Sequence, residues 1–155
     1  MDRDRWMQLA IDQARRGIAA GQSPFGAVVV RAGTLVAAGH NEVWHRTDIT
    51  AHAEVVTIQR ACQTLASIDL SGCSIYTTTE PCPMCASAIH WARLDECVSG
   101  AAIADAAAAG FNELHVPARD LYRQGGSRVR LVEGVLRAEC AALFADWKRA
   151  GGREY

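Results

Sequence analysis

Two short segments of this chain combine residue types that bind metal ions and move protons. His52 precedes Glu54 by two positions, and Cys82 and Cys85 are three positions apart. Zinc binds imidazole and thiolate ligands in a tetrahedral arrangement. Cysteines three apart at the start of a helix project from one face, and the helix N-terminus stabilises their thiolates. The spacing therefore predicts one zinc ion held by His52, Cys82 and Cys85.

The number of ligands indicates which kind of zinc site this would be. A structural site fills its fourth position with protein, whereas a catalytic site leaves that position to water, whose pKa zinc lowers towards about 7. In the first turn of an expected helix, Glu54 can reach such a water and carry its proton to a substrate. Glu80, just before the cysteine pair, can assist proton transfer or accept a hydrogen bond near the site. We therefore predict a catalytic site that uses Glu54 and Glu80.

Other kinds of site also contain a cysteine pair with this spacing. A redox dithiol would leave His52 and Glu54 without a role. A closed structural site needs a fourth ligand, and none of the available histidines lies in a comparable motif: His40, His45, His90 and His115. A non-catalytic zinc module remains the alternative to an enzyme.

The elements that must position these residues follow an alternating pattern. Helices are expected over 5–20, 51–65, 83–92 and 136–149, with a short helix or loop over 104–109. Strands are expected over 25–31, 34–38, 73–79, 96–101 and 128–132, with a loop over 39–49 and no element between 110 and 127. The turn at Ala32-Gly33 makes the first two strands a hairpin, and the strand–helix–strand order implies parallel neighbours. We expect a mixed five-stranded sheet between helices, a three-layer α/β/α fold.

Length, composition and charge limit the possible classes of protein. The 155 residues fit a single domain over 1–155, and 50% apolar with 21% charged residues is typical of a folded globule. No apolar run approaches the roughly 20 residues of a membrane span, and the charged start is unlike a secretory signal, so a cytoplasmic protein is expected. The net charge of −1 favours a small ligand over a phosphate backbone. The other four cysteines stand alone in apolar stretches and are expected to be reduced and buried: Cys62, Cys73, Cys97 and Cys140.

At its motifs the chain resembles the cytidine deaminase-like superfamily, and within it the bacterial guanine deaminases. The pairing of H-x-E with P-C-x-x-C is a signature of zinc deaminases. Further matching segments are 24–28, 39–41, 89–93, 105–111 and 154–155, and the Phe111 segment and the terminal Tyr155 favour guanine among the bases. The resemblance implies a cytidine deaminase-like fold, one zinc ion per chain, and hydrolysis of guanine to xanthine and ammonia.

The resemblance also implies roles around the substrate. Asn41 would hydrogen-bond the purine. Glu113 would read the N–H groups of guanine, although the family typically has Asp there, so the exact base is open. Tyr155 would enter the pocket on a C-terminal segment swapped between the subunits of a homodimer, with Gly151-Gly152 allowing the exchange. The expected apolar walls are Phe25, Trp91 and Phe111.

Two other substrates are alternatives. Residues 132–144 resemble the last strand and helix of tRNA adenosine deaminases, beside a modest basic stretch: Arg119, Arg123, Arg128 and Arg130. The net charge, the short tail, and Phe25 where tRNA enzymes tend to have an aliphatic residue make nucleic acid an unexpected partner. Cytosine or another small aminated heterocycle is the third possibility.

Overall fold

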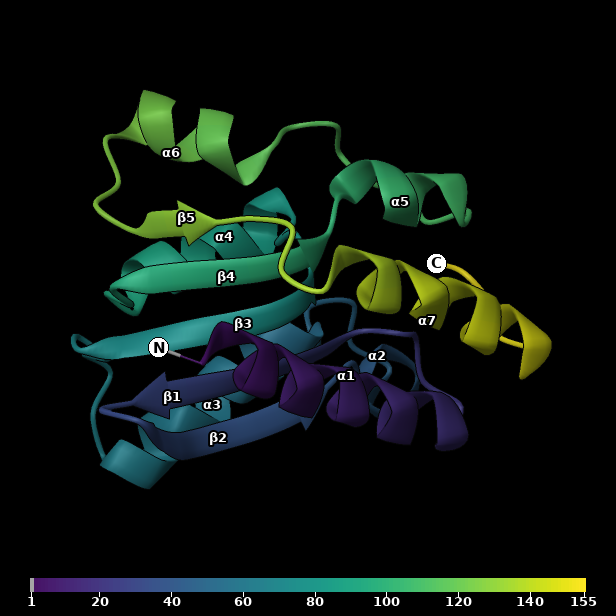
Figure 1. The fold of residues 1–155 in the computed structure, drawn as a ribbon, viewed down its shortest axis with the longest axis horizontal. Helices are drawn as coiled ribbons and strands as arrows, with labels where there is room; N and C mark the ends of the chain where they lie inside the picture. Colours follow the sequence, from purple (N-terminus) through teal and green to yellow (C-terminus); the bar gives the residue numbers. More distant parts are fainter. Residues whose placement is uncertain (1) are drawn as a thin grey trace.

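One mixed sheet of five strands forms the centre of the computed structural model, which describes residues 2–155 (Figure 1). The strands lie in the order β2-β1-β3-β4-β5 and are β1 (Gly26–Arg31), β2 (Thr34–His40), β3 (Cys73–Thr79), β4 (Glu96–Ala101) and β5 (Arg130–Val132). β1 is antiparallel to β2 and β3, whereas β3, β4 and β5 are parallel. The expected hairpin, parallel core and five-stranded mixed sheet are confirmed.

Helices cover both faces of this sheet, which explains why its central strands are apolar along their length. α1 (Arg3–Ala19) and α7 (Arg137–Arg149) lie on one face, and α3 (Ala53–Leu65) and α4 (Pro83–Trp91) lie on the other (Figure 1). α1 turns an apolar stripe that includes Met7 and Ile11 towards the sheet, and the Asp2 carboxylate caps its start by accepting from the Arg5 N–H. The three-layer α/β/α prediction is therefore confirmed.

α1 packs unusually closely on β1 because Gly26 has no side chain. A methyl group on Gly26 would overlap the Ala10 carbonyl oxygen and would lie 2.5 Å from the Ala14 nitrogen. The Gly26 N–H donates to Thr78 Oγ1 on β3 at 3.1 Å. The start of β1 is thereby held between α1 and β3, and Phe25 is held with it.

Two helices lie where none was expected. α2 (Val43–Arg46) interrupts the predicted 39–49 loop, and α6 (Ala118–Gly125) lies in the stretch left without an element. Pro117 before α6 and Gly126 after it, with φ +67°, are ordinary boundary signals. α6 has eight residues and buries only Ala118 and Tyr122, so it contributes few apolar positions to the sequence pattern.

Smaller differences concern element ends and one undecided segment. α5 (Ile103–Ala108) shows that the undecided 104–109 segment is a helix, and β2 extends two residues beyond its predicted end. No helix within residues 2–155 is long and apolar enough to cross a membrane.

The strand ends define one edge of the sheet as the place for a site. β3 and β4 end at Thr79 and Ala101, and the antiparallel β2 ends beside the start of β1. In α/β sheets ligands bind outside the carboxyl ends of the parallel strands. Asn41 follows β2 and Glu80 follows β3, so both lie at this edge.

Candidate active site

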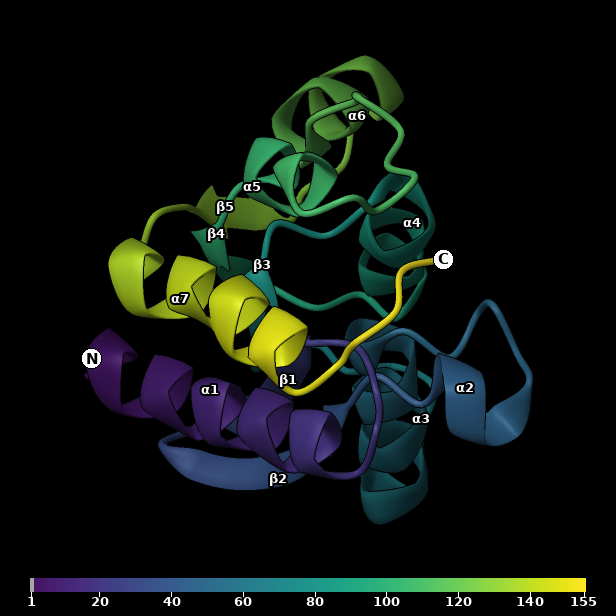
Figure 2. The same cartoon turned by 90° about the vertical axis from the view of Figure 1, so that its right-hand side faces the viewer.

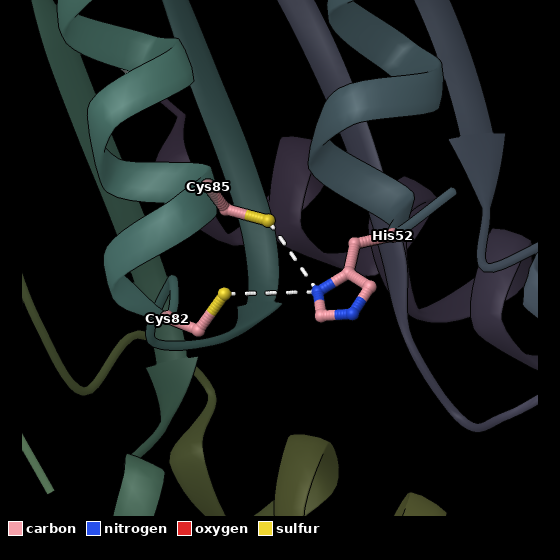
Figure 3. A group of neighbouring side chains, drawn as sticks. All are labelled: His52, Cys82 and Cys85. Carbon is pink, nitrogen blue, oxygen red and sulfur yellow. Dashed lines mark hydrogen bonds between the residues drawn. The ribbon is translucent and has the colours of Figure 1, made fainter. Parts of the chain in front are cut away.

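The starts of two helices bring the three predicted metal ligands together (Figure 3). His52 is the N-cap residue of α3, Cys82 is the N-cap residue of α4, and Cys85 lies in the first turn of α4. The Nδ1 atom of His52 lies 3.7 Å from Cys82 Sγ and 3.5 Å from Cys85 Sγ. All three ligand atoms lie within 4.8 Å of one another.

This donor set fits zinc. With Zn–N near 2.0 Å and Zn–S near 2.3 Å, a tetrahedral ion separates its nitrogen and sulfur ligands by about 3.5 Å, close to the separations found here. Within the described chain no other His, Cys, Asp or Glu joins this group. The other histidines therefore do not close the site, and three protein ligands are the pattern of a catalytic zinc.

Local electrostatics prepare one of the three ligands, Cys82, for binding a metal. The hydrogen bond from Cys85, against the cost of burial and with help from His52, lowers the pKa of Cys82 to about 4. That same hydrogen bond and burial raise the pKa of Cys85 well above its usual value. Burial alone would lower the pKa of His52, but its hydrogen bond with Cys82 and the nearby Glu54 raise it overall. The group thus holds a thiolate before any ion binds, and thiolates attract zinc.

Glu54 lies beside the ligand group in a buried position. Its Oε1 accepts a hydrogen bond of 3.0 Å from Thr77 Oγ1, and it lines a hollow shared with His52 and Cys82. Burial, reinforced by Cys82, raises the pKa of the Glu54 carboxyl. A raised pKa suits a group that both accepts and returns a proton. Thr77 was not among the predicted site residues, and its only signal in the sequence is a run of threonines inside a buried strand.

A cleft opens beside the ligand group and is lined by His52, Cys82, Glu113 and Tyr155. The C-terminal segment of the same chain closes one side of this cleft. It leaves α7 and crosses the molecule towards α4 (Figure 2). Tyr155 Oη accepts a hydrogen bond of 2.6 Å from Asn41 Nδ2, while Asn41 Oδ1 accepts from the Val43 N–H. Gly151 has φ +77°, and a side chain on Gly152 would overlap the Trp147 ring. The two glycines are therefore required for the path that the tail follows here, whether or not they also allow the predicted exchange of tails between subunits.

Aromatic rings and one carboxylate form the rest of the cleft. The Phe111 ring lies 5.0 Å from that of Phe25 and 5.4 Å from that of Tyr155, in edge-to-face contacts. Glu113 lines the cleft together with His52 and Cys82. Burial, reinforced by Cys82, raises the pKa of Glu113 to about 7. The structure thus brings together the predicted substrate residues from four separate segments: Phe25, Asn41, Phe111, Glu113 and Tyr155.

Trp91 is the exception, because the structure does not bring it to the cleft of its own chain. It lies at the far end of α4 from the cysteines and is 82% exposed. α4 is anchored by the buried Cys85 and Ile89, and a residue two positions beyond Ile89 points about 200° away around the helix. Trp91 therefore faces outwards, and its prediction as a wall of this cleft is wrong for the single chain.

Glu80 lies at the cleft but has hydrogen-bond partners that the sequence did not predict. Its Oε1 accepts from the Ala118 N–H at 3.0 Å, and its Oε2 accepts from the Ile103 N–H at 3.2 Å. Both carboxylate oxygens are thus used by backbone groups. Of the two roles expected for Glu80, this geometry favours the hydrogen-bond acceptor.

Comparison with known proteins connects this geometry to one family. The family model described as "Cytidine and deoxycytidylate deaminase zinc-binding region" matches residues 1–101. The chain is 37% identical over 157 aligned residues to a guanine deaminase of Bacillus subtilis, covering 100% of both chains. It is 32% identical to a tRNA-specific adenosine deaminase of the same organism, covering 93% of this chain and 87% of that protein. A structure solved with 2,6-diaminopurine superposes with a TM-score of 0.89 at 31% identity, covering 99% of this chain and 85% of the other.

Proposed function

Since the chain belongs to the zinc-binding cytidine and deoxycytidylate deaminase family, we propose that it hydrolyses guanine to xanthine and ammonia. The observation that carries this proposal is the buried Glu54 beside three zinc ligands, in a cleft that also holds Glu113. A structural zinc site has no use for a buried carboxylate beside its ligands, whereas hydrolysis needs one there.

Each catalytic group has a defined task in this reaction. His52, Cys82 and Cys85 would hold a zinc ion, which when bound would supply Lewis-acid activation of a water molecule. Glu54 accepts the proton that the attacking water loses, and Thr77 holds the receiving carboxylate in place. As water adds to the carbon that bears the amino group, Glu54 gives this first proton to the ring nitrogen. Glu54 then takes the remaining proton from the added hydroxyl group and gives it to the departing amine, while the hydroxyl becomes a carbonyl. The C–N bond breaks, and xanthine and ammonia leave.

The remaining residues of the cleft hold the purine. Asn41 uses one amide hydrogen for Tyr155, and its second amide hydrogen would donate to a ring acceptor of the bound purine. Ionised Glu113 accepts hydrogen bonds from the N–H groups of guanine. The rings of Phe25, Phe111 and Tyr155 provide apolar walls for the flat base.

An ammonia-release assay with guanine, adenine, cytosine and their nucleosides tests the proposed function. Glu54→Gln should keep zinc and fold but lower kcat for guanine by about 10²–10⁴, since it removes the proton carrier. Zinc content by mass spectrometry and melting temperature provide the checks, and Glu139→Gln, on the exposed side of α7, is the matched control. Turnover of another base without turnover of guanine would overturn the substrate, and an active Glu54→Gln would overturn the role of Glu54.

A tRNA substrate is the second candidate, because a tRNA-specific relative matches most of the chain. Three arginines of the predicted basic stretch are neutralised by ion pairs: Arg119 with Glu133, Arg123 with Asp120, and Arg130 with Glu96. Only Arg128 of that stretch has no ion pair in the described structure. An A-to-I assay on tRNA distinguishes the two, since RNA binding falls steeply with salt and guanine turnover should not.

We also propose that the protein is a cytoplasmic homodimer that acts in purine breakdown. The support for a dimer is the apolar rim of the cleft, where Ile49 and Leu114 are exposed. Sedimentation velocity tests the dimer. A swapped tail is tested by mixing inactive Glu54→Gln with inactive Tyr155→Phe chains, because one complete site forms in a mixed dimer only if tails are exchanged.

A further inference from the structure

We propose that Glu80 positions the substrate-facing segment 103–118 against the metal-binding turn, and that it does not itself transfer a proton. The inference builds on the proposed function for its kinetic readout. Its structural part rests on the two hydrogen bonds that the Glu80 carboxylate accepts from Ile103 and Ala118.

Those two donors are the first residues of α5 and α6. The first N–H groups of a helix have no partner within the helix, so each needs an acceptor from elsewhere. One carboxylate serves both, with Oε2 on α5 and Oε1 on α6. Glu80 therefore holds the two ends of the segment that runs from Ile103 to Ala118.

The part of this segment between the helices carries the side chains of the cleft. Residues 110–117 lie outside helices and strands, and they include Phe111 and Glu113. In the described structure, the one backbone hydrogen bond that links them to the chain outside α5 and α6 runs from the Asn112 N–H to the Tyr155 carbonyl at 3.3 Å. Phe111 is anchored by packing against Trp147, but Glu113 and the residues after it are not. The position of Glu113 therefore depends strongly on how the ends are held.

Glu80 is itself fixed to the metal-binding turn. Its N–H donates to the Ala101 carbonyl at 2.7 Å, and Cys82 follows two residues later. A single residue thus links the turn that carries a zinc ligand to the segment that carries Glu113. Both oxygens of the Glu80 carboxylate already accept hydrogen bonds from backbone groups, which argues for a positioning role.

Glu80→Gln is the direct test, because the amide keeps the size of the side chain but turns an NH₂ group towards one N–H donor. We expect zinc to be retained, the KM for guanine to rise about tenfold, the pH profile of kcat to stay unchanged, and amide hydrogen exchange in 103–118 to quicken. Glu54→Gln should instead lower kcat and leave this exchange unchanged. The control Glu139→Gln should leave KM, kcat and the amide hydrogen exchange of 103–118 unchanged.

Ala118→Pro provides a second test that leaves Glu80 intact. Proline removes the N–H that Oε1 accepts and is tolerated at the first position of a helix. If Glu80 positions the segment, Ala118→Pro should reproduce the rise in KM and the faster amide hydrogen exchange. If Glu80→Gln lowers kcat a hundredfold or more with unchanged KM and exchange, the proposal is overturned. The exchange measurement needs no substrate, so it tests the anchor even if guanine proves not to be the substrate.

Discussion

Three carboxylates lie around the cleft, and their surroundings separate their chemistry. Glu54 is buried beside the zinc ligands and is held by Thr77. Glu80 is used by two backbone N–H groups. Glu113 is half-buried, and burial raises its pKa to about 7. Carboxylates whose environments differ in this way take different roles in one site, which supports the proposed roles of proton transfer for Glu54, positioning for Glu80 and substrate recognition for Glu113.

The raised pKa of Glu113 predicts pH-dependent binding of guanine. Below its pKa the carboxyl carries a proton and loses acceptor capacity, so the Kd should rise as the pH falls through about 7, approaching tenfold per pH unit on the acid side. Equilibrium dialysis with labelled guanine, on Glu54→Gln so that no turnover occurs, measures this between pH 5 and 8.

The control is the Glu54→Gln, Glu113→Gln double variant, which should bind guanine weakly with no dependence on pH. A Kd that stays constant with pH while Glu113 is present would show that this carboxyl does not read guanine.

At the scale of elements, the site depends on how closely the helices and strands approach, since its residues sit at their ends. His52 and Cys82 start two helices, Asn41 follows β2, and Phe25 precedes β1. Gly26 lets α1 lie directly on β1 and donates to Thr78, the neighbour of the Thr77 that holds Glu54. Packing on the side away from the metal therefore affects both Phe25 and Glu54.

Gly26→Ala should destabilise the protein by about 1–3 kcal/mol, because its methyl group forces α1 away from β1. For a chain of this size that corresponds to a melting temperature lower by roughly 3–10 °C. Differential scanning calorimetry measures it, with activity at a permissive temperature as a second readout.

Gly125→Ala is the matched control, since nothing lies within 4 Å of a methyl group there. It should be neutral or slightly stabilising. Equal melting temperatures for the two variants would contradict the tight packing of α1 on β1.

At the scale of the whole molecule, the site joins segments from most of the chain. The metal ligands come from the starts of α3 and α4, and the tail after α7 returns to contact Asn41, which lies 114 residues earlier in the chain. A zinc ion would therefore link the starts of α3 and α4, and the tail links the C-terminus to the residue that follows β2. A ligand that binds the folded but not the unfolded chain adds to its stability.

Chelation of zinc should abolish activity and lower the melting temperature, and added zinc should restore both. It should also expose Cys82 to iodoacetamide, because its pKa of about 4 keeps it a thiolate at neutral pH. The cysteines outside the site should react slowly, since burial raises the pKa of each, to about 12 in Cys140. Mass spectrometry of labelled peptides checks this, and labelling of Cys82 at the same rate with and without zinc would contradict its role as a ligand.

What could be predicted from the sequence alone depended on short spacing. The members of each pair lie within one helical turn, His52 with Glu54 at the start of α3 and Cys82 with Cys85 at the start of α4. The local backbone therefore sets the geometry within each pair. The alternation of apolar segments likewise determined the mixed sheet and its helical layers, because burial acts on each element separately. α6 could have been found from Pro117 and Gly126, but it is short and polar and buries only two residues.

Only the tertiary structure decided which distant groups meet. Trp91 faces outwards because Cys85 and Ile89 set the orientation of α4. Thr77 reaches Glu54 from another element, and Glu80 reaches backbone groups 23 and 38 residues away. Such contacts depend on how elements pack and not on the spacing of residues within one element. The sequence by itself therefore determined the candidate metal ligands and the class of fold, and the packing decided which partners each carboxylate of the cleft meets.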